Sequence, residues 1–428
     1  MINEGAGINR YENQGEQATR TILLCAWGNN NGHINHCISV GRAAAAKGWR
    51  VVVATSEDPL HERLIRDEGF ACHLYPKELI PDHMWLCWYN PDFLRDSVAA
   101  DRQLIRTTGA QVVIHDIRMS IPIAAAIERV ACASVCHEPL LPGFSYPGLG
   151  TTGLWIQPQG IREMNRVLGE EGEELISADM RELLLRGGII IPSIPEFDQV
   201  PPAFPAQTHH VGPLDVPVPS VTQADNASRS RIFFYRTVGA NRSLPAFKRV
   251  FEEFGDRVYI ATGSPDGARL LKNELADTDF NIAPYWNKDE IYPNAAIAVH
   301  HGGPGTVLDC MATGTPSIVL PGSSPERCFY GKKVQDLGIG VTVDANPSLT
   351  GNWHTAADSV DTTDWTHVGE LARQLFQDGH VRDNCRRLRE RVARSEYESI
   401  ATVIENLRPY GDNRMPDPAF SAGDRGPL

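Results

Sequence analysis

The sequence has 428 residues, which predicts two or three domains, each able to bury a core of its own. Its formal net charge is −13, which argues against a surface that coats a phosphate backbone, so we do not expect nucleic acid as the main partner. The sequence contains no run of about 18 apolar residues, so we expect a soluble protein without a membrane span.

The nine cysteines are an odd number and form no C-x-x-C pair. A disulfide framework and a zinc knuckle therefore both fit poorly, and we expect reduced thiols and a cytoplasmic location. Residues 1–20 are polar and lack the apolar stretch of a secretory signal, so we expect a disordered leader there.

From Thr21 the pattern becomes regular. TILLCAW predicts a strand, GNNNG a turn and the next segment a helix, while RVVVAT predicts a second strand. Helical spacing places apolar residues on one face of that helix, and Gly48 is expected as its C-cap; the face comprises Ile34, Cys37, Ile38, Gly41, Ala44 and Ala45. The unit recurs in QVVIHD, SIPIAAAIERV and ACASVC, which indicates a parallel sheet.

A proline-dense stretch over 192–219 and the polar TQADNASRSR predict a connector, after which strand and helix patterns alternate again. We expect a first domain over 21–215, a linker over 216–230 and a second domain over 231–395. Residues 396–428 are expected to form a helix that crosses back to the first domain, followed by a tail. The fold class is therefore α/β, with two Rossmann-like, doubly wound parallel-sheet domains that face a cleft.

The strongest motif begins at the end of a predicted strand, where HHGGPGT predicts a glycine-rich turn that leads into a helix near Thr306. Main-chain amides and the helix N-terminus would together suit a diphosphate. The residues concerned are His301, Gly302, Gly303, Gly305 and Thr306. The motif lacks the G-K-[ST] of a Walker loop and the third glycine of a dinucleotide fingerprint, and a simple tight turn is the alternative.

HHGGPGT, GTPSIVLP and ERCFYGKKVQDLGIGV together resemble the nucleotide-sugar signature of the inverting UDP-glycosyltransferase family, especially its bacterial natural-product branch, which has the GT-B fold. GHINHCISVGRAAAAKGWRVVVAT is similar to the opening of that family, and the likeness spans residues 21–341. It implies an enzyme that moves a sugar from a UDP- or TDP-sugar to a hydroxyl of a small-molecule acceptor, such as an antibiotic precursor. It further implies inversion, no metal or other cofactor, and a monomer or homodimer.

The resemblance assigns the general base to His33, in a G-H-x-x-P-type loop where His36 replaces the usual proline, and its aspartate partner to Asp116. Both residues follow strands whose carboxyl ends share one sheet edge, and imidazole suits base catalysis near neutral pH. The alternatives are a His33 that merely caps or packs, and an Asp116 that caps the following helix. We expect His36 to be structural and His115 to pack within the sheet.

For the donor, the resemblance places the base-stacking aromatic at Tyr285, beside Trp286, and the contacts to the sugar hydroxyls at Glu326 and Arg327. Arg327 replaces an amide. It would read an acidic or unusual donor group, reach the diphosphate, or simply pair with Glu326 or a neighbouring acid. Thr237 is the one candidate in the loop after the first strand of the second domain, where the glycine-serine pattern of the family is lost.

The aromatic segment 83–93 supplies Trp85, Trp88 and Tyr89 as candidates for an acceptor wall, with an aromatic core patch as the alternative. Asp277 and Asp279 form a D-x-D that we expect to be a solvated turn, and we expect no metal. Two other functions are possible from the sequence: a nucleotide-sugar epimerase of the same architecture, and a non-catalytic helper of a glycosyltransferase.

Overall fold

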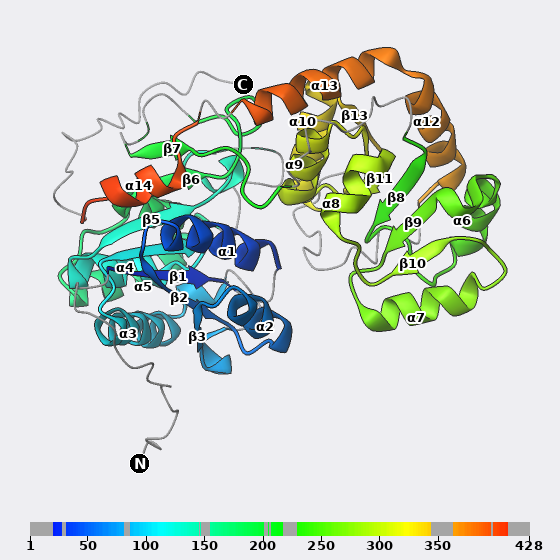
Figure 1. The fold of residues 1–428 in the computed structure, drawn as a ribbon. Helices are drawn as coiled ribbons and strands as arrows, with labels where there is room; N and C mark the ends of the chain where they lie inside the picture. The colour runs from blue at the N-terminus through cyan, green and yellow to red at the C-terminus, as the bar shows by residue number, and fades with distance from the viewer. Residues whose placement is uncertain are drawn as a thin grey trace.

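The computed structural model describes residues 20–27, 31–80, 86–144, 146, 155–200, 204, 207–216, 229–343, 363–394 and 397–409. Two lobes are visible in Figure 1, one built from the blue-to-green first half of the chain and one from the green-to-orange second half. Each lobe is organised around its own parallel sheet.

The first sheet has seven parallel strands in the order β3-β2-β1-β4-β5-β6-β7. The strands are β1 (Thr21–Ala26), β2 (Arg50–Thr55), β3 (Ala71–Leu74), β4 (Val112–Asp116), β5 (Ala131–Val135), β6 (Gly188–Ile191) and β7 (Thr208–His210). The central strands β1, β4 and β5 are buried along their whole length, as expected for apolar runs covered on both faces.

Five α-helices accompany this sheet: α1 (Asn31–Ala45), α2 (Pro59–Asp67), α3 (Pro91–Thr108), α4 (Ser120–Glu128) and α5 (Pro158–Glu170). Short 3-10 turns occur at Lys77–Leu79, Leu86–Tyr89, Glu138–Leu140 and Met180–Arg186. The predicted apolar face of α1 is buried except at Ala45, which is exposed, and Gly48 takes the left-handed conformation, with φ 79°.

The second sheet has six parallel strands in the order β10-β9-β8-β11-β12-β13. They are β8 (Arg231–Tyr235), β9 (Val258–Ala261), β10 (Asn281–Ala283), β11 (Ala295–His300), β12 (Ser317–Val319) and β13 (Gly340–Thr342). Helices and turns connect them: α6 (Leu244–Phe251), a 3-10 turn (Glu252–Arg257), α7 (Pro265–Glu274), α8 (Lys288–Ile291), a 3-10 turn (Tyr292–Asn294), α9 (Pro304–Thr313) and α10 (Pro325–Asp336). Two such doubly wound domains confirm the predicted fold class.

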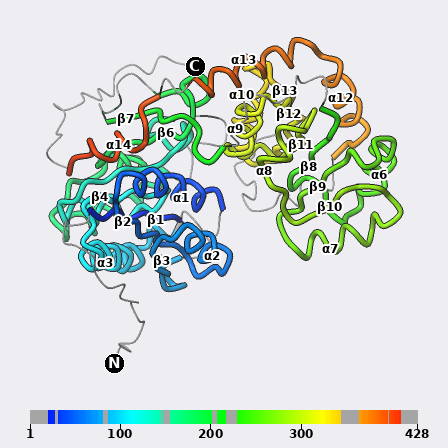
Figure 2. Tube along the Cα trace, in the orientation of Figure 1, coloured from blue at the N-terminus to red at the C-terminus, as the bar shows by residue number. Residues whose placement is uncertain are grey.

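After the second sheet, the chain returns to the first domain. Helices α12 (Trp365–Gln377) and α13 (Gly379–Ala393) lie on the second domain, whereas α14 (Ile400–Asn406) packs beside α1 of the first. The trace in Figure 2 passes from orange at α12 to red at α14 along this route. Val403, Ile404 and Leu407 are buried in the same core cluster as Ile34 and Ile38, so this segment completes the first domain.

The two domains share an apolar cluster beside α10. Phe197, which follows β6, stacks on Tyr330 of α10 with ring centroids 5.2 Å apart, and Phe144 meets Phe329 at 5.0 Å. The ammonium of Lys333 lies 2.9 Å from the carboxylate of Glu138. The middle of α10 is therefore fixed against the loops that follow β5 and β6.

None of the nine cysteines forms a disulfide bond. None of the described helices combines the length and the apolarity that a bilayer crossing needs.

Candidate functional site

Asp116 and two histidines meet at the carboxyl end of the first sheet. Asp116 is the last residue of β4, while His33 and His36 lie one turn apart on α1. Nδ1 of His33 is 2.8 Å from Oδ1 of Asp116, and Nδ1 of His36 is 2.8 Å from Oδ2. Both predicted catalytic residues are thus in hydrogen-bond contact.

Burial and charge set the electrostatics of this group. The side chain of Asp116 is 4% exposed, and although burial alone would raise its pKa, the imidazoles hold that pKa well below its ordinary value. Burial would lower the pKa of His33, but the charge and hydrogen bond of Asp116 raise it above 6.5. An ionised carboxylate only accepts hydrogen bonds, so both Nδ1 atoms donate.

Asp116 does not cap the following helix, which was its alternative role. The N-cap position of α4 is Met119, and no side chain caps that helix. His115 points away from the group. Its Nε2 lies 2.6 Å from the hydroxyl of Ser134, and burial lowers its pKa to about 3, so it is a neutral residue within the sheet, as expected.

A second imidazole–carboxylate pair, which the sequence analysis missed, lies next to the first. Nδ1 of His137, which follows β5, is 2.6 Å from Oδ2 of Asp198, and its ring centroid is 5.9 Å from that of His36. Burial alone would lower the pKa of His137, but Asp198 raises it. The rule that selected Asp116, a polar residue at the carboxyl end of a buried strand, would also have selected His137.

Glu326 faces these histidines from the first turn of α10 in the second domain. Burial raises its pKa, while the charges of Arg327, His137 and His33 act in the opposite direction. The histidines of the first domain and the first turn of α10 are therefore close enough for their charges to interact.

The glycine-rich turn leads from β11 into α9, which begins at Pro304, close to the predicted start near Thr306. Gly302 has φ 89°, and a Cβ there would lie 2.7 Å from the side chain of Val319, so the position requires glycine. Nδ1 of His300 accepts the amide of Gly302 at 3.1 Å and fixes the turn. The first amides of α9 have no partner within the helix, which leaves donors for an anion.

Two arginines, Arg236 and Arg327, flank this turn, and the charge of Glu326 acts on Arg327. Burial lowers the pKa of Arg327, the charge of Glu326 raises it, and the charge of Arg236 lowers it further. Burial also lowers the pKa of His301, and the charges of both arginines add to that effect. Arg236 has φ 54°, and its side chain fills the space beside Gly263. Thr237 is buried, and its hydroxyl has no hydrogen-bond partner among the described residues.

The two predicted base-binding aromatics differ in exposure. Tyr285 is 46% exposed, and its hydroxyl donates to the carbonyl of Gly263 at 2.5 Å. The indole of Trp286 donates to the carbonyl of Ile260 at 3.1 Å and packs against Tyr259. Tyr285 is therefore the more exposed of the two rings, and Trp286 is half-buried.

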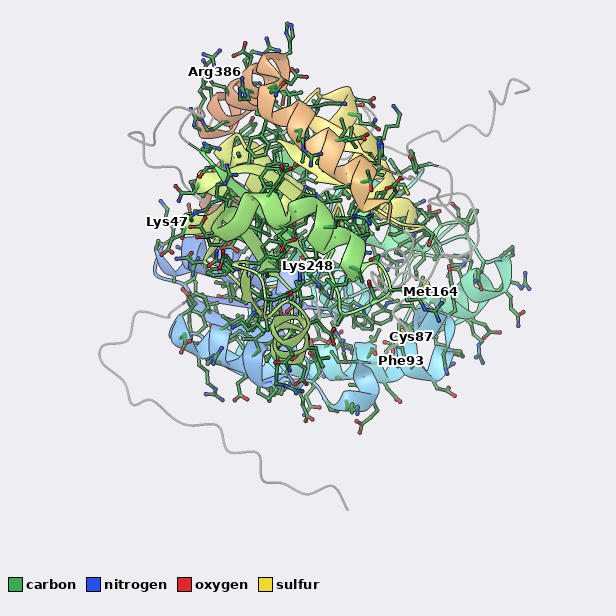
Figure 3. The ribbon with its side chains drawn as sticks, turned by 90° about the vertical axis from the view of Figure 1, so that its right-hand side faces the viewer. Lys47, Cys87, Phe93, Met164, Lys248 and Arg386 are labelled. Atoms are coloured by element: carbon green, nitrogen blue, oxygen red, sulfur yellow. The ribbon has the colours of Figure 1, made fainter. Side chains whose placement is uncertain are left out.

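The predicted acceptor wall requires a correction. Trp88 is 0% exposed and packs against Trp27 and Phe93, so its ring belongs to the core of the first domain, as the alternative stated. Tyr89 packs against Gly160 of α5, and Trp85 lies outside the described residues. In Figure 3, Cys87 and Phe93 lie near Met164, a residue of the same apolar cluster.

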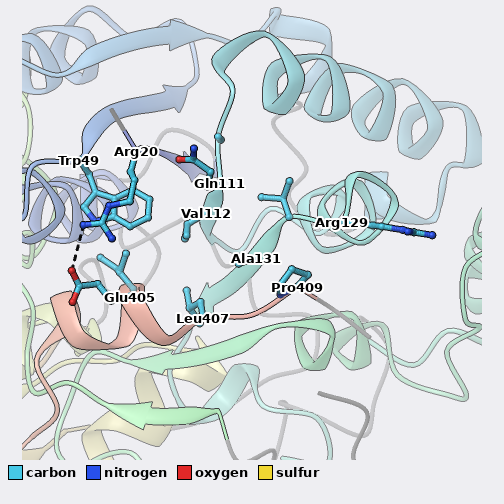
Figure 4. A pocket seen from close by; sticks show the side chains of 12 residues that line it. Arg20, Trp49, Gln111, Val112, Arg129, Ala131, Glu405, Leu407 and Pro409 are labelled. Atoms are coloured by element: carbon cyan, nitrogen blue, oxygen red, sulfur yellow. Dashed lines mark hydrogen bonds and ion pairs between the residues drawn. The ribbon is translucent and has the colours of Figure 1, made fainter. Parts of the chain in front are cut away.

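The D-x-D segment lies at the surface, where Asp277 pairs with Lys248. No group of three or more histidine, cysteine or acidic side chains among the described residues is arranged to hold a metal ion. Figure 4 shows a shallow pocket between α14 and the amino ends of β1, β4 and β5. It lies at the sheet edge opposite to Asp116 and contains an Arg20–Glu405 pair at 3.5 Å.

Two parallel-sheet domains with polar side chains gathered where their strand ends meet are the architecture of GT-B proteins. Residues 241–327 match the glycosyltransferase family 28 C-terminal domain. The crystal structure of CalG4, the calicheamicin glycosyltransferase, aligns with 91% of this chain and 97% of its own, with a TM-score of 0.64 and 16% identity. The structure of the Streptomyces sp. SF2575 glycosyltransferase SsfS6 complexed with thymidine diphosphate aligns with 90% and 98%, with a TM-score of 0.54 and 17% identity.

Among curated proteins, a PGL/p-HBAD biosynthesis glycosyltransferase of Mycobacterium tuberculosis is 23% identical over 316 residues, covering 66% of this chain and 72% of that protein. The demethyllactenocin mycarosyltransferase of Streptomyces fradiae is 21% identical over 425 residues, covering 88% and 84%. The resemblance seen in the sequence is confirmed at this level. The protein is a glycosyltransferase with the GT-B fold, related to the bacterial natural-product glycosyltransferases.

Proposed function

We propose that the protein transfers a sugar from a nucleotide diphosphate sugar to a hydroxyl group of a small-molecule natural product, with inversion. The observation that carries the proposal is the His33–Asp116 pair of the first domain, at 2.8 Å, facing Glu326 of the second. A base on one domain thus lies opposite a residue proposed to contact the donor sugar on the other.

His33 acts as the general base. Its Nδ1–H is held by Asp116, so Nε2 is the atom that takes the proton from the acceptor hydroxyl. Asp116 stabilises the imidazolium that forms, and by raising the pKa of His33 it makes the imidazole a stronger base. The deprotonated oxygen attacks the anomeric carbon from the side opposite to the nucleotide, and a single displacement inverts that carbon.

The second domain holds the donor. The amides at the start of α9, together with Arg236 and Arg327, are available for the diphosphate, on which negative charge builds as the sugar leaves. These protein groups stabilise the negative charge of the diphosphate, as a bound metal cation would. Tyr285 stacks on the nucleotide base, and Glu326 accepts hydrogen bonds from sugar hydroxyls.

The names of the relatives support the substrate classes. The curated relatives include a mycarosyltransferase and a dTDP-epi-vancosaminyltransferase, and a structural neighbour holds thymidine diphosphate. We therefore propose a UDP- or TDP-linked donor and a natural-product acceptor, which mass spectrometry can identify after incubation with a panel of nucleotide sugars and acceptors.

The variant His33→Ala tests the base. We expect turnover to fall about 10²- to 10⁴-fold, the usual contribution of a general base. Affinity for the nucleotide diphosphate, measured by isothermal titration calorimetry, should stay at the level of the unmodified protein, because His33 lies on the other domain. Near-normal turnover would remove His33 from this role.

A further inference from the structure

The carboxylate of Asp116 is held from both sides, and the mechanism above uses only one of them. His33 donates to Oδ1 and His36 to Oδ2, each at 2.8 Å. The side chains of His33 and His36 are 12% and 15% exposed, while that of Asp116 is 4% exposed. A buried carboxylate with two matched donors is a more specific arrangement than a catalytic pair requires.

The arrangement follows from local geometry. Residues three apart on a helix lie on the same face, so α1 presents both imidazoles to the end of β4. The proline that the family resemblance leads one to expect at position 36 carries no side-chain donor and would leave Oδ2 without this bond. His36 is therefore a departure with a defined contact.

Other charged and titratable groups face this set from the surrounding elements. His137 lies 5.9 Å from His36, ring to ring, and is paired with Asp198. The remaining groups are His61 on α2, Glu326 on α10, and the thiols of Cys37 and Cys136. Only His33 and His36 form a hydrogen bond with the side chain of Asp116 among the described residues.

We propose that His36 is a positioning residue of the transfer reaction, which holds the second oxygen of Asp116 and so limits how strongly that carboxylate retains a proton on His33. The inference rests on the proposed function. A carboxylate that faced His33 alone would concentrate its charge on one imidazole, whereas a second donor shares that charge.

The consequence is that His33 stays unprotonated at a lower pH than it would without His36. His33 must be neutral to accept a proton, and the Asp116 charge alone favours its protonated form. Because His36 takes part of that charge, the neutral form of His33 persists further into the acidic range than it would in a chain with proline at this position.

Two substitutions separate this role from simple packing. His36→Ala removes the donor, whereas in His36→Asn the amide nitrogen stands as far from the backbone as Nδ1 of histidine and can still donate to Oδ2. His73→Asn, on an edge strand of the first domain, is a matched control that does not touch Asp116. Circular dichroism of each variant establishes that it is folded.

The primary measurement is the titration midpoint of His33. NMR of the full chain with labelled histidine monitors this titration, and the variant His33→Asn identifies the signal of His33. We expect its midpoint to rise by about half to one pH unit in His36→Ala and to return most of the way in His36→Asn. In His36→Ala the acid limb of the kcat/KM pH profile should shift to higher pH by the same amount. Activity at pH values below the limb should therefore fall roughly three- to tenfold. His73→Asn should change neither.

A midpoint of His33 that is the same in all variants overturns the inference, as does a downward shift in His36→Ala. Equal losses of activity in His36→Ala and His36→Asn with an unmoved limb would show a structural role only. The titration does not depend on sugar transfer. If the midpoint moves but no acceptor is glycosylated, the proposed function has failed; if transfer depends on His33 while the midpoint stays, this inference has failed.

Discussion

Arg236 occupies a left-handed backbone conformation, with φ 54°, at the first position after β8. This conformation costs a non-glycine residue about 1–2 kcal/mol, and such strain persists where the surroundings impose it. The guanidinium lies close to Arg327 and His301, where Glu326 is the acidic group that acts on Arg327. A bound diphosphate would supply further negative charge to the two arginines.

Arg236→Gly should therefore weaken donor binding without lowering stability. We expect affinity for UDP or TDP to fall about ten- to hundredfold, the value of a charge-assisted hydrogen bond, in isothermal titration. The thermal midpoint should not fall, because glycine relieves the left-handed strain. Arg249→Ala, at an exposed position of α6, is the control and should bind normally. Unchanged affinity in Arg236→Gly would exclude Arg236 from the donor site.

The contact between His33 and Asp116 could be predicted because strand ends in a parallel sheet share an edge. The pairing of His137 with Asp198 could not, because Asp198 lies in a turn beyond the end of β6 and no strand pattern places that turn. The prediction of Trp88 as a surface aromatic was wrong because its ring turns inward. It packs at a tilt against Trp27, with the ring centroids 4.7 Å apart.

At the level of elements, the apolar runs of the first domain predicted β1, β2, β4 and β5, whereas the buried strand β6 and the edge strands β3 and β7 were missed. β1 and β4 are apolar throughout and stand out in the sequence, whereas β3 and β7 are short, half-exposed edge strands that carry histidine. β7 is the three-residue segment THH within the proline-dense stretch, so it forms by pairing with β6 and not through its own pattern.

β13 depends on a glycine. A Cβ at Gly340 would lie 2.0 Å from the backbone carbonyl oxygen of Ser317 on the paired strand β12. Gly340→Ala should lower the free energy of unfolding by at least about 1–3 kcal/mol, because backbone atoms must shift. Gly379→Ala, where a Cβ meets no atom within 4 Å, should leave stability unchanged or slightly raised. Urea denaturation of both variants measures the difference, and equal stability would contradict the steric argument.

At the scale of the whole molecule, the domains are linked by contacts that also position the site. Phe197, Tyr330 and the Lys333–Glu138 ion pair join α10 to the loops after β5 and β6. The same helix carries Glu326 and Arg327 in its first turn, so the packing between domains and the placement of those two residues are parts of one arrangement. The sequence predicted two domains and a returning helix, but not which side chains join them.

The returning helix should stabilise the first domain. Ile404 is 1% exposed and packs in the core with α1, so Ile404→Ala should cost about 2–5 kcal/mol of unfolding free energy. Glu405→Gln alters an exposed pair with Arg20 and should change stability by less than ~1 kcal/mol. Calorimetry resolves the two domains if their transitions differ. If Ile404→Ala lowered the unfolding free energy of the second domain only, the result would contradict the packing of α14 on the first domain.

The first domain receives its strands by residue 210 but its last core side chains only from residues 403–407. During synthesis on the ribosome, a nascent chain that has completed all seven strands still leaves the apolar surface of α1 and β5 uncovered while the entire second domain is translated. Maturation of the first domain must therefore wait for the second, and a pause or truncation late in translation would damage the half of the molecule that was made first.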